Sequence, residues 1–179
     1  SMKNIKISPQ FSEDPISAKT AFLKYGFHVE CGIWSDTECG KIIETGEKYR
    51  GTVVNGPMIL DQVHKIDEQF LTAMKKTEVV NIVEYIFSGT ASGIQSGFFF
   101  CPPGTKGFLA HQDNIFVDAD PNAFILAWTA LCNVGRENGC LFLYPRTHQE
   151  PILPLRAVKD GTPIDVPADA YSGETAVPE

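Results

Sequence analysis

Long apolar runs are missing from this 179-residue sequence. No stretch approaches the roughly 20 apolar residues that a membrane-spanning helix needs, and no signal peptide is visible. The opening Ser1-Met2 has the form of a tag-cleavage scar before a natural start. Positive charge is also scarce, since 15 Lys and Arg face 22 Asp and Glu, for a net charge of −7. Because Lys and Arg drive binding to phosphates, we expect neither nucleic acid nor membrane as a partner.

Cysteine pairs at metal-binding spacing are missing as well. The chain has 5 cysteines, an odd number, and no CxxC. This pattern argues against a zinc site made of cysteines and predicts reduced, mostly buried thiols. Reduced thiols are typical of the cytosol, so a cytoplasmic location is expected.

The first helix is predicted by apolar spacing near the N-terminus. Ala18, Phe22 and Leu23 indicate a short amphipathic helix that ends near Gly26. Apolar and polar residues then alternate, which predicts a strand over residues 27–33.

Two further helices complete a helical N-terminal part, residues 2–90. Ser35 and Glu38 have the spacing of a capping box, so a helix should begin there. Apolar residues recur at helical spacing from Asp67 to Phe87 and predict one long helix over this stretch.

After Gly89 the composition predicts a mainly β region, residues 91–150. Aromatic and β-branched residues are frequent there, and Asn138-Gly139 favours a hairpin turn between two strands. Residues 151–179 are rich in proline and read as a loop-rich tail. The predicted strands are IQSGFFF, FLAHQDNIFV, AFILAWTALCNV and GCLFLYP.

Two metal-binding side chains, His111 and Asp113, are separated by one residue in HQDN. On a strand, positions i and i+2 point to the same face, so both groups could reach one ion. An imidazole and a carboxylate with one further His form the facial triad of non-haem Fe(II) oxygenases. The pair alone is a weak signal, because HxD arises often by chance.

The surrounding motifs add specificity. PPGTKGFLAHQDN, AWTAL and ENGCLFLYPRTHQ, in this order, resemble the phytanoyl-CoA dioxygenase family. The resemblance implies a mainly β chain with N-terminal helices, a double-stranded β-helix of the cupin-like jelly-roll type. It further implies a single oxygenase domain over 1–179 that uses Fe(II) and 2-oxoglutarate. Such an enzyme would hydroxylate a small-molecule substrate and release succinate and CO₂.

The resemblance also implies roles for individual residues. His111 and Asp113 match the first two iron ligands and would be the catalytic pair. A carboxylate at 113 speaks against the halogenases of this class, which have a small residue there. Gln112 either helps to position the co-substrate or packs within its strand. Asn114 should point to the same side as Gln112 and bond a neighbouring loop.

Other matched positions would approach 2-oxoglutarate. Gln95 and Gly97 match positions near the co-substrate, Gly97 through its backbone. Trp128 matches a residue of that pocket, although a core aromatic in a buried strand is nearly as good an interpretation. His148 ends the motif in which Arg146 replaces the usual Gly, and it would shape a loop. The other histidines, His28 and His64, are interpreted as structural or surface residues.

The chain lacks two parts that the family needs. Residues 149–179 contain no His for the third ligand, and Arg156 comes too early to bind the distal carboxylate of 2-oxoglutarate. We expect a C-terminal truncation in which late strands are missing, which would leave an open sheet edge. A short natural isoform, or a third ligand from His148 or a partner subunit, are the alternatives.

Two other functions are compatible with the same sequence motifs. The alternative to an active enzyme is a non-catalytic binding or regulatory protein on the same barrel. A third possibility is a cupin-like metal enzyme, such as an isomerase, that does not use 2-oxoglutarate. Binding of 2-oxoglutarate separates the oxygenase from the isomerase, and its turnover to succinate separates the oxygenase from the regulatory protein.

Overall fold

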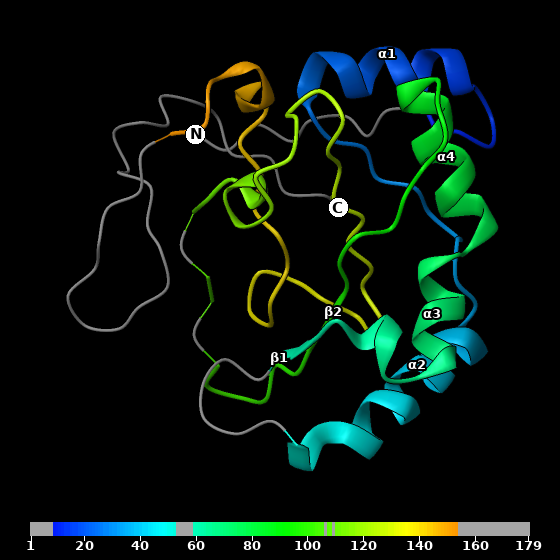
Figure 1. Cartoon of the computed structure of the whole chain (residues 1–179), viewed down its shortest axis with the longest axis vertical. Helices are drawn as coiled ribbons and strands as arrows, with labels where there is room; N and C mark the ends of the chain where they lie inside the picture. The colour runs from blue at the N-terminus through cyan, green and yellow to red at the C-terminus, as the bar shows by residue number, and fades with distance from the viewer. Residues whose placement is uncertain (1–8, 53–58, 106, 109, 154–179) are drawn as a thin grey trace. The chain divides into compact units, whose positions relative to one another are not determined.

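The computed structural model describes residues 9–52, 59–105, 107–108 and 110–153. The chain forms two compact units, drawn together in Figure 1. No helix within the described ranges is long and apolar enough to cross a membrane. The first unit comprises Ser1–Cys31, Lys106–Leu126 and Cys140–Glu179, and the second comprises Gly32–Thr105 and Ala127–Gly139.

The second unit holds most of the regular structure. Its helices α2 and α3 pack on each other, and β1 pairs with β2 beside them (Figure 1). The elements of this unit are α2 (Asp36–Tyr49), β1 (Ile59–Asp61), α3 (Glu68–Met74), α4 (Thr77–Phe87) and β2 (Gly97–Phe99). Apolar side chains from these elements and their flanks form its core: Ile42, Leu60, Val63, Phe70 and Phe100.

Helix α2 begins where the capping-box pattern predicts. The Ser35 hydroxyl accepts a hydrogen bond from the Glu38 backbone N–H, and the Glu38 carboxylate accepts one from the Ser35 N–H at 2.8 Å. These reciprocal bonds satisfy two backbone donors that a helix leaves unpaired at its N-terminus. The predicted start of this helix is confirmed.

The predicted long helix over residues 67–87 is wrong, because the structure divides it into α3 and α4. Lys76 lies between the two helices with a non-helical backbone (φ −51°, ψ 118°). Its ammonium group lies 2.6 Å from the Glu38 carboxylate on α2 and 5.0 Å from the centre of the Trp34 ring. These contacts stabilise the break between the helices. The apolar residues that recur at helical spacing are therefore divided between α3 and α4.

The only sheet among the described residues is the antiparallel pair of β1 and β2. Ile59 pairs with Phe99, and Leu60 pairs with Phe98. Strand β2 falls within the predicted stretch IQSGFFF, whereas β1 was not predicted. Leu60 is buried, while Phe99 on the opposite side of the ladder is 47% exposed. The alternation of β2 therefore turns one face of the ladder toward the core.

In the first unit, helix α1 (Pro15–Tyr25) confirms the predicted N-terminal helix and its end. Asp14 caps its start by accepting a hydrogen bond from the Ser17 N–H at 3.0 Å. Gly26 ends it with φ +84°, a left-handed conformation that glycine adopts without a Cβ penalty.

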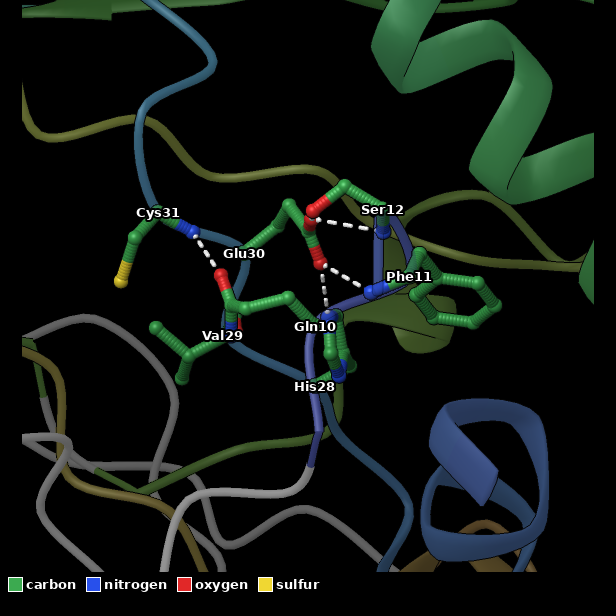
Figure 2. Close-up of polar contacts among 7 residues, drawn as sticks. All are labelled: Gln10, Phe11, Ser12, His28, Val29, Glu30 and Cys31. Carbon is green, nitrogen blue, oxygen red and sulfur yellow. Dashed lines mark hydrogen bonds and ion pairs between the residues drawn. The ribbon is translucent and has the colours of Figure 1, made fainter. Parts of the chain in front are cut away.

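The strand predicted over residues 27–33 is wrong. Side chains, rather than a neighbouring strand, bond this backbone (Figure 2). The Gln10 amide donates to the Val29 carbonyl at 2.9 Å and accepts from the Cys31 N–H at 2.5 Å. Because the Gln10 amide bonds two of the backbone polar groups that a ladder would pair, this segment is held in place without being part of a sheet.

Glu30 links the same segment to residues 11 and 12 of the first unit. Its carboxylate accepts hydrogen bonds from the Phe11 N–H at 2.8 Å and the Ser12 hydroxyl at 3.2 Å, and it lies 2.6 Å from His28 Nε2 (Figure 2). Burial raises the pKa of Glu30, but the hydrogen bonds from His28 and from residues 11–12 outweigh it and lower the pKa overall. The interpretation of His28 as structural fits these contacts.

The strands predicted after residue 107 are absent from the described part of that region. Residues 123–134 are irregular, with Leu126 57% and Trp128 43% exposed, and the stretch GCLFLYP keeps a single bridge residue, Leu143. A turn does form where predicted, because the Asn138 N–H donates to the Gly135 carbonyl at 3.1 Å, but no hairpin strands flank it. The mainly β fold is therefore not confirmed, since strands need pairing partners beyond their own composition. The tail beyond residue 153 lies outside the described residues.

All five cysteines are described, and each is a free thiol. The predicted reduced state stays a prediction. The prediction that most are buried is wrong, because Cys31, Cys101 and Cys132 are exposed to solvent. Cys39 and Cys140 are partly buried.

Candidate metal-binding site

His111 and Asp113 meet in the first unit. His111 Nε2 lies 3.3 Å from Asp113 Oδ1. The predicted strand is wrong here, because His111 lies in irregular chain and Asp113 begins the short 3₁₀ helix η3 (Asp113–Phe116). Gln112 between them is extended (φ −106°, ψ 120°), which is enough to bring both side chains to one side.

The pair fits a divalent metal ion in spacing and chemistry. Two donor atoms bound at ~2.1 Å and at about 90° to each other lie about 3 Å apart. The observed 3.3 Å between Nε2 and Oδ1 is close to this separation. The side chains are 24% and 45% exposed, so an ion can reach them from solvent. Imidazole and carboxylate are two of the three ligands of a facial triad.

A third ligand is not found in the part of the chain that the structure describes. No group of three His, Cys, Asp or Glu side chains that could hold a metal ion occurs within residues 9–52, 59–105, 107–108 and 110–153. His148, the alternative ligand within the chain, bonds the Leu23 carbonyl instead, at 2.9 Å from its Nε2. The site among the described residues is therefore a two-residue pair.

Two aromatic rings flank His111, and their role was missed in the sequence. The Phe108 and Phe116 rings lie edge-on to the imidazole, at 6.3 Å and 5.6 Å between centroids. Edge-to-face contacts of this kind favour a defined ring orientation. The signal was available, since FLAHQDNIF places a Phe on each side of the pair.

Gln112 points away from the pair, as expected for the intervening residue. Its amide nitrogen donates to the Pro151 carbonyl at 3.1 Å, and its amide oxygen accepts from the Leu153 N–H at 2.7 Å. No pattern in the sequence indicates these partners. The expected role of Gln112 toward the co-substrate stays a prediction.

Asn114 bonds a neighbouring loop, as predicted. Its side-chain amide donates to the Ala119 carbonyl at 2.8 Å and accepts from the Ala119 N–H at 3.0 Å. These two bonds close the turn that follows η3.

The motif PRTH holds the end of α1. Arg146 is left-handed (φ +69°), the conformation that the Gly usual at this position adopts without strain. Its backbone N–H donates to the Tyr25 carbonyl at 2.8 Å, and its guanidinium lies 5.7 Å from the Tyr25 ring centre. The His148 ring occupies the space beside Gly26 that a Cβ would need. His148 thus shapes a loop contact, in agreement with the sequence expectation.

The other matched residues belong to the second unit. Gln95 is exposed ahead of β2, and Gly97 pairs with Asp61 in the ladder. A Cβ on Gly97 would lie 3.3 Å from the Phe99 side chain, which leaves little room for a larger residue. Trp128 is 43% exposed, so the interpretation as a buried core aromatic is wrong. Contacts of these three residues with 2-oxoglutarate stay a prediction.

The last histidine, His64, has a structural setting in the second unit. Its Nδ1 lies 2.6 Å from the Ser96 hydroxyl, which also accepts a hydrogen bond from the His64 backbone N–H at 3.1 Å. The hydroxyl thereby links the 3₁₀ helix Val63–Lys65 to the chain ahead of β2.

Comparison with known proteins adds an independent observation. The sequence matches the family described as phytanoyl-CoA dioxygenase (PhyH) over residues 24–178. Phytanoyl-CoA dioxygenase 1 of Oryza sativa subsp. japonica is 30% identical over 119 residues, which is 65% of this chain and 42% of that protein. The peroxisomal phytanoyl-CoA dioxygenase of Bos taurus is 29% identical over 93 residues, 49% of this chain and 28% of that protein.

A third relative covers more of the chain. Phytanoyl-CoA dioxygenase domain-containing protein 1 of Danio rerio is 26% identical over 131 residues, 72% of this chain and 42% of that protein. The chain therefore spans less than half the length of each of these relatives. No solved structure matches it.

Proposed function

The chain belongs to the phytanoyl-CoA dioxygenase family, whose members are Fe(II)- and 2-oxoglutarate-dependent oxygenases with a cupin-like fold, and we propose that it provides two ligands of such an iron site. Its activity would be hydroxylation of a small-molecule substrate, with release of succinate and CO₂. The observation that carries the proposal is the 3.3 Å approach of His111 Nε2 to Asp113 Oδ1 inside a sequence match of this length.

The two side chains would hold the iron together. His111 would bind through Nε2, the atom that faces the carboxylate, and Asp113 would bind through Oδ1. Fe(II) held there would supply the oxidative chemistry by which O₂ and 2-oxoglutarate hydroxylate a C–H bond. The protein's share is to hold both donors at the right separation and to keep the imidazole oriented between Phe108 and Phe116.

The remaining parts of the site are proposals of the same kind. Gln95, the Gly97 backbone and Trp128 would contact 2-oxoglutarate, each at a position that matches the family motifs. The third ligand and the cation for the distal carboxylate of 2-oxoglutarate would come from outside the described residues. A site with two protein ligands holds Fe(II) weakly, so assays need high Fe(II) concentrations.

Anaerobic titration with Fe(II) and 2-oxoglutarate tests the proposal. Chelation of Fe(II) by 2-oxoglutarate gives a visible charge-transfer band, which we expect to be weak in this chain and to require both additions. Replacement Asp113→Ala should abolish the band. Asp118→Asn is the matched control, because Asp118 is an exposed carboxylate on the same loop with φ +53°, which Asn tolerates.

The outcomes separate the candidate functions. A band with succinate formation under O₂ supports the oxygenase, whereas a band without succinate favours the non-catalytic protein on the same fold. Binding of Fe(II) without any effect of 2-oxoglutarate favours a cupin-like metal enzyme of another type. An equal band in wild type and Asp113→Ala rules out the ligand assignment.

A further inference from the structure

The side chain of Gln112 makes hydrogen bonds that its place between two metal ligands does not explain. Its side-chain amide bonds the carbonyl of Pro151 and the N–H of Leu153, at 3.1 Å and 2.7 Å. In an extended chain the carbonyl of one residue and the N–H two residues later point to the same side. One residue of a neighbouring parallel strand would bond these two groups, with its own N–H and its own C=O. The Gln112 side-chain amide takes the place of that residue.

The same arrangement occurs a second time in the first unit. Gln10 donates to the Val29 carbonyl and accepts from the Cys31 N–H, again with one residue between the two partners (Figure 2). That glutamine fixes an irregular segment to the N-terminal chain. The two glutamines use the same chemistry, but only Gln112 is adjacent to the metal-binding pair.

The segment that Gln112 bonds is held at its other end as well. Arg146 donates its N–H to the Tyr25 carbonyl, and His148 bonds the Leu23 carbonyl. Residues 146–153, which we call the strap, therefore run from the C-terminal end of α1 to the side chain of Gln112. All of these contacts lie within the first unit.

We infer that Gln112 is a positioning residue of the metal site, which acts through the strap rather than by touching 2-oxoglutarate. The hydrogen bonds of the Gln112 side chain to Pro151 and Leu153 fix how the backbone at residue 112 is turned about the chain direction. Because Gln112 is extended, this rotation determines where the side chains of His111 and Asp113 point. The inference rests on the proposed function only in taking the His111–Asp113 pair as ligands.

Replacement Gln112→Met tests the inference, because methionine keeps the length of the side chain and removes both hydrogen bonds. Gln10→Met is the matched control, since it removes two bonds of the same pattern away from the pair. Loss of the bond to Leu153 should speed exchange of its amide proton about five- to tenfold. Loss of a partner that orients metal ligands should weaken Mn(II) binding about tenfold.

A third readout needs no metal. Nuclear Overhauser contacts between the His111 and Phe116 rings, 5.6 Å apart, should weaken in Gln112→Met and persist in Gln10→Met. Gln112→Glu should be intermediate, because its carboxylate can still accept from Leu153 but cannot donate to Pro151. If wild type binds no Mn(II), the proposed function fails, while amide exchange and ring contacts still decide the inference.

Two results would overturn the inference. One is a Gln112→Met variant with wild-type ring contacts and wild-type Mn(II) affinity. The other is a variant whose only defect is weaker binding of 2-oxoglutarate, which indicates direct contact with the co-substrate. Faster Leu153 exchange together with displaced rings, absent from the Gln10→Met control, supports it.

Discussion

The tip of the Phe98 ring fills the space beside Gly46 that a Cβ would need. Gly46 lies on α2 and is buried, while Phe98 lies on β2 and contacts Phe70 and Phe100 at 5.6 Å and 5.0 Å between ring centres. A residue with no side chain thus lets the aromatic cluster approach the helix backbone. Gly40, on the same helix, has nothing within 4 Å of the equivalent position.

These two glycines predict opposite effects of one substitution. Gly46→Ala should destabilise the protein by about 1–3 kcal/mol, because the added methyl group overlaps the Phe98 ring. Gly40→Ala should stabilise it by about 0.5–1 kcal/mol, because alanine has the higher helix propensity and meets no neighbour. Urea unfolding of both variants measures the difference. Equal effects of the two would contradict the packing described for Gly46.

The left-handed backbone of Arg146 predicts a preference for glycine. Arg146→Gly and Arg146→Ala both remove the guanidinium from the Tyr25 ring and keep the backbone hydrogen bond to the Tyr25 carbonyl. Only alanine retains the strain of φ +69°. The free energy of unfolding of Arg146→Gly should therefore exceed that of Arg146→Ala by about 0.5–1 kcal/mol. This difference already includes the greater conformational freedom of glycine in the unfolded state. Thermal unfolding of the two variants decides, and a more stable alanine variant would refute the strain.

Glu38 predicts a loss of stability in acid. Its hydrogen bonds with Lys76 and Ser35 lower its pKa from 4.5 to about 2. A carboxyl with a lowered pKa stabilises the fold above its unfolded value, and this contribution disappears as the pH falls toward the folded value. The free energy of unfolding should therefore decline between pH 4.5 and about 2. Fluorescence of Trp34, which lies under Lys76, can follow unfolding in urea.

Glu38→Gln isolates this contribution. Gln retains the capping box with Ser35 but not the ion pair with Lys76, so the variant should show a shallower decline over the same pH range. Glu44→Gln, an exposed carboxylate on the same helix, serves as the control and should behave like wild type. Because the Glu38–Lys76 pair is partly exposed, salt should reduce the difference. Identical pH profiles for Glu38→Gln and wild type would contradict the prediction.

Signals that act within one turn of the chain predicted structure well. The Ser35–Glu38 capping box and the end of α1 at Gly26 are local, and both are found where expected. The break at Lys76 could not be predicted in this way. It depends on Glu38, 38 residues earlier, whereas the apolar period continues across the break. The same dependence on distant partners explains why apolar composition alone misidentified residues 123–134 as a strand.

The candidate site was predictable in part. The spacing of His111 and Asp113 indicated a common target, and the structure brings the two groups within 3.3 Å. The two groups approach each other without the strand that the sequence predicts. Instead, an extended Gln112 leads directly into a 3₁₀ turn. The partners of Gln112 at residues 151–153 could not be anticipated, since no pattern in the sequence links positions about 40 residues apart.

Mn(II) titration of the 179-residue chain, monitored through the NMR signals of its histidine rings, tests the metal-binding role of His111 and Asp113 most directly. The sequence has only 4 histidines, so His28, His64 and His148 serve as internal controls for His111. We expect paramagnetic broadening to affect the His111 ring first, and Asp113→Ala to abolish this selectivity. Broadening that begins at another histidine, or that is unchanged in Asp113→Ala, would contradict the assignment of this pair as metal ligands.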